Sequence, residues 1–328
     1  MSGLIVLLGA GASVDAGMPT VADLTKELRQ RLPDLRDMNG KRGADFPRLF
    51  DRIARLDPTA SCNYERFFQW IEFLFKARVE PFGQIVELKI GSRLVDAASY
   101  IRPVIGEEIK RLLVSRKTKP RYLARLAGFI PQKGRLDVFI LNYDCCVEDA
   151  CRAAKIDITT GFDPDTHLWK PSVFRIRWRG LNLHKLHGSL RWFPERYGTT
   201  LRELRPKDRK QLSPCPAVSH LPELVLGPAS KVQDDDPFLT LFCRFTAAMR
   251  RARTCVVMGY GYGDDHINAV IKRGLEAGVS VIDVNPGGPS SLFQRRGYSY
   301  RHVGTSGRPF PSARDVLTRP EILAPYFH

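Results

Sequence analysis

The apolar positions of the sequence fall into two patterns that alternate along the chain. Short apolar runs of strand length occupy 4–8, 136–142, 181–188, 224–227, 254–260 and 279–285. Between them, apolar residues recur at helical spacing over 21–31, 64–78, 84–116, 119–129, 147–154, 237–252 and 265–277. Strands that alternate with helices predict a parallel sheet with helices on both faces. We therefore expect an α/β protein with a Rossmann-like sheet.

One long segment departs from this alternation. Residues 25–130 have helical patterning and no good strand, which predicts a helical insertion between the first and second strands. The segments 1–24 and 131–300 would then form the core that contains the sheet. The remaining segment, 301–328, is rich in Gly, Pro and Ser and is expected to be a C-terminal tail.

Small and polar residues follow five of the predicted strands. Ligands of open α/β sheets bind beyond the carboxyl ends of the strands. The residues at these ends are Gly9-Ala10-Gly11-Ala12-Ser13, Asn142-Tyr143-Asp144, Leu186-His187-Gly188-Ser189, Gly259-Tyr260-Gly261-Tyr262-Gly263-Asp264 and Asn285-Pro286. If the sheet is correct, all five ends converge on one crevice, which is the candidate binding site.

The first loop has the strand, glycine turn and helix of a dinucleotide-binding crossover, but Val14 stands where the fingerprint needs its third glycine. Such a loop can still hold a pyrophosphate through backbone N–H groups at a helix N-terminus. The alternative is a glycine turn that only lets the strand and helix pack closely.

The motifs at these strand ends resemble those of the sirtuin superfamily. "GAGASVDAGMP" is similar to the sirtuin glycine loop, "NYD" to its Asn-x-Asp segment, and "LHG" to the segment that bears its catalytic histidine. "MGYGYGDDHIN" and "VIDVNP" resemble the late glycine loop and the strand end that hold the adenosine half of NAD. These motifs occur in the sirtuin order. The Gly-Tyr…Asp form, with "NYD" and "LHGSLRW", looks closer to the bacterial sirtuin-like NADases of anti-phage defence than to the protein deacylases.

This resemblance implies that NAD is a substrate, cleaved between nicotinamide and ribose. His187 would act as general base, and Asn142 would hold a ribose hydroxyl or the attacking water. The residues implied to bind the cofactor are Gly9, Ala10, Gly11, Ala12, Ser13, Pro19, Asp144, Gly259, Tyr260, Gly261, Asp264 and Asn285. Asp144 would meet the nicotinamide carboxamide. The alternative for His187 is a strand-end histidine that only hydrogen bonds to backbone carbonyls.

One feature of deacylase sirtuins is missing from the sequence. Their zinc module has two Cys-x-x-Cys pairs, and this chain has none; Cys145, Cys146 and Cys151 cluster without a spacing suited to zinc. We expect no bound metal, and we expect the helical insertion to replace the zinc module. Water then becomes the favoured acceptor, and the resemblance implies an NAD glycohydrolase that acts as an abortive-infection effector. The alternatives are a deacylase or ADP-ribosyltransferase, or a non-catalytic nucleotide-binding module.

Charge and cysteine use suggest where the protein acts and what it contacts. Lys and Arg total 51 against 35 Asp and Glu, so the net charge of +16 favours anionic partners, including nucleic acid. Seven cysteines without regular spacing are typical of a reduced, cytoplasmic chain. No apolar run approaches the about 20 residues of a membrane helix, and the run 4–8 is too short for a signal-peptide core. The resemblance implies a homo-oligomer, in some relatives with a separately encoded ATPase or a nucleic-acid-guided partner.

Overall fold

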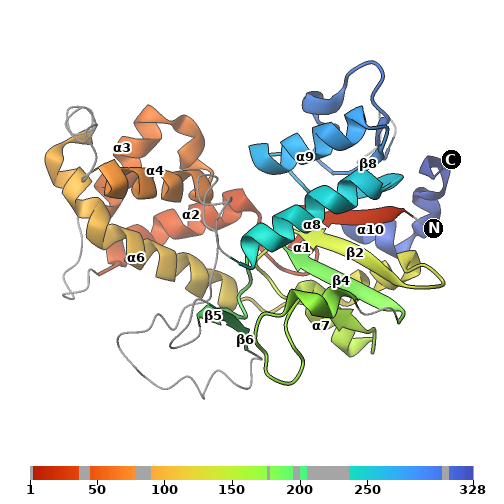
Figure 1. Ribbon diagram of the computed structural model, residues 1–328. Helices are drawn as coiled ribbons and strands as arrows, with labels where there is room; N and C mark the ends of the chain where they lie inside the picture. The colour runs from red at the N-terminus through yellow and green to blue at the C-terminus, as the bar shows by residue number, and fades with distance from the viewer. Residues whose placement is uncertain are drawn as a thin grey trace. The chain divides into compact units, whose positions relative to one another are not determined.

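The centre of the structure is a parallel sheet of seven strands (Figure 1). The computed structural model describes residues 3–36, 45–77, 90–175, 178–194, 200–204, 236–304 and 310–327. Its strands are β1 (Leu4–Leu8), β2 (Arg135–Ile140), β3 (Ile158–Thr159), β4 (Gly180–Lys185), β7 (Thr254–Met258), β8 (Ser280–Val284) and β9 (Tyr300–His302). They lie in the order β3-β4-β2-β1-β7-β8-β9, and all neighbours pair in parallel. The predicted α/β class with a Rossmann-like sheet is confirmed.

The sheet is covered on both faces, which explains why every residue of the inner strands β1 and β4 is buried. The helices α7 (Cys146–Ala153), α8 (Phe238–Arg251) and α9 (Asp265–Glu276) connect the strands. In Figure 1, α8 and α9 lie along one side of the sheet and α7 along the other. Every residue of β1 is buried, as expected for the central strand. The 3-10 helix η3 (Arg121–Phe129) packs against α7 and α10 (Ala313–Thr318).

The smaller elements complete this part of the chain. The strands β5 (Trp192–Pro194) and β6 (Leu201–Glu203) form a separate antiparallel pair. The short helical segments are α1 (Gly11–Val14), η4 (Pro171–Arg175), η7 (Ser291–Phe293), η8 (Pro320–Ile322) and η9 (Ala324–Tyr326). The predicted strand 224–227 lies outside the described residues. The segment 119–129, predicted as an α-helix, contains the 3-10 helix η3 instead.

A second group of helices lies between β1 and β2 in the sequence. Its members are α2 (Val21–Arg31), η1 (Leu32–Asp34), α3 (Asp45–Leu56), η2 (Pro58–Ser61), α4 (Tyr64–Ala77) and α6 (Ser92–Val114). A capping box between Thr20 and Asp23 begins α2. Their shared core includes the rings of Phe50 and Phe67, whose centroids are 4.7 Å apart.

The described residues divide into two compact units. One contains residues 3–18, 117–204 and 236–327, and the other contains 19–116. The C-terminal segment belongs to the first unit, where Ser312 Oγ donates to Asp15 Oδ2 at 2.8 Å. The predicted bounds of the core (1–24 and 131–300), the insertion (25–130) and the tail (301–328) stay predictions. Among the helices that the structure describes, none has the length and apolar character needed to span a membrane.

Candidate functional site

The carboxyl ends of five strands are level with one another. In the pairing register, the row Lys185, Ile140, Leu8, Met258 and Val284 joins the last residues of β4, β2, β1, β7 and β8. The segments that follow these residues are the five strand ends singled out in the sequence. Because neighbouring strands lie about 4.8 Å apart, these segments form one continuous edge.

The loops after β1 and β7 are in tight contact at this edge. Gly9 N donates to Met258 O at 3.0 Å, and Gly11 N donates to Gly259 O at 2.8 Å. Gly259 has a φ of +63°, and a Cβ at this position would lie 2.2 Å from Ala12 N. A Cβ on Gly11 would lie 2.8 Å from Gly259 Cα. The glycines are therefore needed for the two loops to approach each other.

This packing uses most of the N–H groups of the first loop. Besides Gly9 and Gly11, Ala12 N donates to Gly9 O at 2.9 Å and Ser13 N donates to Ala10 O at 3.0 Å. Of the two interpretations of the loop, the geometry favours the close-packing one, because α1 has only four residues and its N–H groups are engaged within the protein. Contacts of Gly9–Ser13 with a cofactor stay a prediction.

Asn142 and Ser13 are brought together from two strand ends. Asn142 Nδ2 donates to Ser13 Oγ at 2.9 Å, and both residues are buried. The other end of this amide, Oδ1, is buried with no partner among the described residues. A buried carbonyl oxygen without a donor is costly, so it is suited to a hydrogen bond from a ligand hydroxyl or water.

His187 is paired with a buried carboxylate. Its Nε2 lies 3.0 Å from Asp264 Oδ2, and the two side chains are 5% and 2% exposed. The ring of Tyr143 packs beside it, with centroids 6.5 Å apart. In the tautomer that donates Nε2–H to Asp264, the other ring nitrogen, Nδ1, is the acceptor. The carboxylate therefore fixes both the orientation and the tautomer of His187.

Asp264 is itself held by the start of α9. Its Oδ1 accepts from His266 N at 3.0 Å and from Ile267 N at 3.3 Å, which makes it the N-cap residue. Tyr260 Oη accepts from Asp264 N at 3.1 Å. The sequence predicted that Asp264 would contact the cofactor. In the structure, both of its carboxylate oxygens are used within the protein, and one of them positions His187.

Asp144 has a comparable place at the start of α7. Its Oδ1 accepts from Cys146 N at 2.9 Å, and its backbone oxygen accepts from Lys185 Nζ. Lys185 is fully buried, and its Nζ also lies 3.2 Å from Glu148 Oε1. Burial alone would lower the pKa of Lys185, but the nearby negative charge of Glu148 outweighs it and raises the pKa. A buried ion pair therefore holds the Asn142–Asp144 segment against β4.

We expect Lys185→Met to lower the free energy of unfolding by about 3–5 kcal/mol, because Glu148 would keep a buried charge without its partner. Chemical denaturation measures this loss. Lys272→Met, at an exposed position of α9, is the matched control and should change stability little. Equal stability of Lys185→Met and the unaltered protein would contradict the buried pair.

The remaining predicted residues have structural partners or stay untested. Asn285 Nδ2 donates to Tyr260 O at 3.0 Å, and so ties the end of β8 to the loop after β7. Gly261 and Ala10 are exposed. Pro19 is the first residue of the second unit. Sequence reasoning did not identify Lys185 or Glu148, since a lysine inside an apolar strand carries no signal of its partner.

The cysteines near this edge have properties of buried, protonated thiols. Burial raises the pKa of Cys145 to about 12, and also raises that of Cys146. Within the described ranges, no group of three or more His, Cys, Asp or Glu side chains is arranged to hold a metal ion.

Comparisons with known proteins point to one family. Residues 137–280 match the family model of the SIR2-like domain. This range contains Asn142, Asp144, His187 and Asp264. A comparison with curated protein sequences finds no match.

Several solved structures are similar over nearly the whole chain. A complex of a SIR2 homologue with NAD has a TM-score of 0.43 and 14% identity, and covers 98% of this chain and 90% of that one. A Sir2 homologue mutant with 2′-O-acetyl ADP-ribose has a TM-score of 0.45 and 16% identity, with 98% and 91% covered. Sir2Tm bound to a propionylated peptide has a TM-score of 0.42 and 14% identity, with 98% and 94% covered. Residues 137–280 of this chain are therefore similar to a SIR2-like domain.

Proposed function

We propose that the protein is an NAD⁺ glycohydrolase. Water attacks the anomeric carbon of the nicotinamide riboside, the bond from that carbon to the pyridinium nitrogen breaks, and neutral nicotinamide leaves with the bonding electrons. The products are nicotinamide, ADP-ribose and one proton. The family of residues 137–280 supports NAD as the substrate, and the resemblance to sirtuin-like NADases supports hydrolysis.

The observation that carries the proposal is the buried pair of His187 and Asp264. An imidazole held by a carboxylate is a general base with a fixed tautomer and a stabilised cation. His187 follows β4 at the same level at which Asn142 follows β2, because Ile140 pairs with Lys185. The base and the amide therefore lie at adjacent strand ends.

The geometry supports a proposed role for each of these residues. His187 accepts the proton of the attacking water as the bond to ribose forms. Asn142 Oδ1, which lacks a donor among the described residues, accepts from the water or a ribose hydroxyl. Its Nδ2 is fixed on Ser13 Oγ, so the amide is already oriented before substrate binds. Burial of His187 and Asp264 keeps bulk water away from this pair.

We expect the purified protein to release nicotinamide from NAD in the absence of any acceptor. The assay is run with NAD alone, with an acylated peptide and with DNA, because acceptor-dependent release would indicate a deacylase or transferase. A chelator is the control for metal dependence, and release should survive it. Release only with the peptide present would contradict hydrolysis, and no release under any condition, with NAD bound, would indicate a binding module.

The biological setting is the broader part of the proposal. An enzyme that consumes NAD without an acceptor drains the cell, as an abortive-infection effector does, and its activity would be controlled by assembly or a partner. Assembly into a homo-oligomer, a separately encoded ATPase and a nucleic-acid-guided partner stay predictions from the resemblance.

A further inference from the structure

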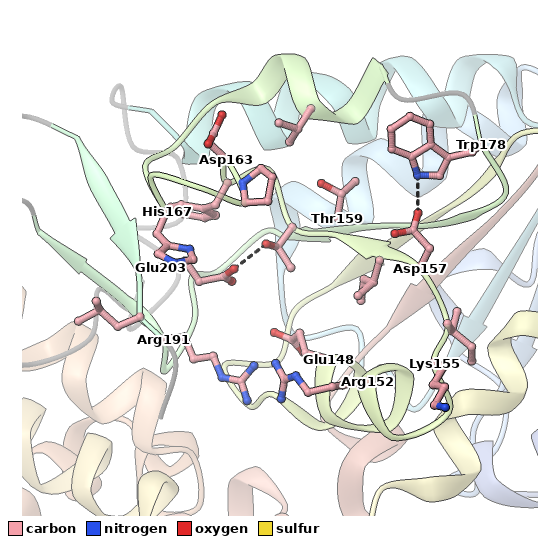
Figure 2. Close-up of a pocket in the computed structure, with 17 residues that line it drawn as sticks. Glu148, Arg152, Lys155, Asp157, Thr159, Asp163, His167, Trp178, Arg191 and Glu203 are labelled. Carbon is pink, nitrogen blue, oxygen red and sulfur yellow. Dashed lines mark hydrogen bonds between the residues drawn. The ribbon is translucent and has the colours of Figure 1, made fainter. Parts of the chain in front are cut away.

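A cavity lies beside α7 and the edge strand β3, and Glu148, the partner of Lys185, is one of its lining residues. Its volume is about 700 Å³, and none of the predicted catalytic or cofactor-binding residues lines it. Figure 2 shows Glu203 and His167 on one side and Trp178 with Asp157 on the opposite side. Cavities of this size accommodate small-molecule ligands.

Four carboxylates line this cavity, and two of them, Glu148 and Glu203, each have a buried oxygen without a donor among the described residues. Glu148 is 3% exposed; its Oε1 is bound by Lys185, and its Oε2 has no partner among the described residues. Glu203 Oε2 accepts from Thr160 Oγ1 at 2.9 Å, whereas its Oε1 has no partner within the same part of the chain. Leaving such oxygens unpaired is costly, so the pair is suited to two donors from a ligand.

Positive groups also line the cavity. Arg152, in the last turn of α7, and Lys155, just after that helix, are exposed. Asp149 Oδ1 accepts from Arg152 Nη1 at 2.9 Å and from Arg191 Nη2 at 2.5 Å. Two guanidinium groups on one carboxylate leave an excess of positive charge. The lining therefore offers acceptors at Glu148 and Glu203 and cationic donors at Arg152 and Lys155.

An aromatic surface completes the lining. Trp178 is 64% exposed. Its Nε1 donates a hydrogen bond to Asp157 Oδ2 at 2.9 Å, which fixes the orientation of the indole ring. A fixed, exposed indole beside a polar cavity is suited to stacking on a flat ligand.

We propose that this cavity binds a small anionic ligand that presents two N–H donors on one planar edge, as a guanine nucleotide does. The N1–H and N2–H groups of guanine would donate to the open oxygens of Glu203 and Glu148, and the phosphate would meet Arg152 and Lys155. Adenine has one donor and one acceptor on the corresponding edge, and its acceptor would face a carboxylate. Free arginine also has a planar donor fork and a carboxylate, but it is a net cation and fills less of the cavity.

Binding of guanosine monophosphate (GMP) to the full-length protein tests this proposal. Calorimetry and thermal melting are carried out with GMP, adenosine monophosphate (AMP), L-arginine and inorganic phosphate. We expect GMP to bind and raise the melting temperature, and AMP to bind at least tenfold more weakly. If arginine bound more tightly than GMP, recognition of two planar N–H donors would be supported, and the ligand would be an amino acid and not a nucleotide.

Two variants and one control separate the site from general effects on folding. Glu203→Gln should weaken GMP binding about tenfold to hundredfold, because a charged acceptor is lost. Burial and the charge of Glu148 raise the pKa of Glu203, because both disfavour its charged form. Glutamine is neutral and avoids this cost, so the melting temperature of the same variant should be no lower than that of the unaltered protein. Lys155→Ala should weaken the binding of both GMP and phosphate. Lys272→Ala, on α9, is the control and should leave the binding of both ligands unchanged. The proposal is wrong if GMP and arginine leave the melting temperature unchanged, or if Glu203→Gln binds the ligand as tightly as the unaltered protein.

Discussion

Replacement of His187 by alanine should lower the rate of NAD cleavage by about 10²–10⁴-fold, the usual cost of losing a positioned acid–base group. NAD binding should persist, because the imidazole acts on the nucleophile and the rest of the edge stays in place. Steady-state nicotinamide release measures the first effect and calorimetry with NAD the second. Asn142→Ala should also reduce turnover while the protein still binds NAD.

Two further substitutions show whether the effect belongs to His187. His266→Ala changes an exposed histidine two residues from Asp264 and should leave cleavage unchanged. Asp264→Asn retains an N-cap oxygen for α9 but removes the charge that stabilises the imidazolium, so it should reduce turnover with little loss of stability. Wild-type turnover by His187→Ala would place the catalytic centre elsewhere.

The long, strongly patterned elements could be predicted from the sequence. The structure places β1 at Leu4–Leu8 and α2 at Val21–Arg31, as the apolar spacing predicted. The strands of the sheet that were missed are β3 and β9, which have two and three residues. Strands of this length carry too few positions for an alternating pattern, and they form because an edge of the sheet is available for pairing.

The partners of the site residues could not be predicted in the same way. His187 and Asp264 are 77 positions apart in the sequence and meet only because β4 and β7 end at the same level. The sequence indicated both residues by their strand ends and assigned Asp264 to the cofactor, which stays a prediction, but it gave no sign that Asp264 pairs with His187. Which groups a carboxylate contacts depends on the loop that carries it, and local patterning does not fix that loop.

The same limit applies to the glycines of the first loop. The spacing of Gly9 and Gly11 is equally consistent with a phosphate cradle and with close packing of backbones. In the structure, a Cβ on Gly9 would lie 2.6 Å from Gly259 O. Close packing therefore accounts for these glycines without a ligand, and a substitution at Gly11 that abolished NAD binding would not by itself identify a phosphate contact.

Gly259→Ala should be the most destabilising glycine substitution at the strand ends. The added Cβ would lie 2.2 Å from Ala12 N and 2.4 Å from Gly11 C, and the φ of +63° is unfavourable for any L side chain. Overpacking against backbone and the left-handed conformation together predict a loss of about 2–5 kcal/mol in the free energy of unfolding. Urea denaturation measures this loss.

The chain contains a matched control two residues away. Gly261 lies in the same loop, has no positive φ, and has no atom within 4 Å of the position of an added Cβ. Gly261→Ala should therefore leave stability unchanged. The Gly259 variant should also cleave NAD more slowly than the Gly261 variant, because a shift of this loop moves Asp264 away from His187. If both variants unfolded at the same urea concentration as the unaltered protein, the two loops would not be in the contact that places the catalytic pair.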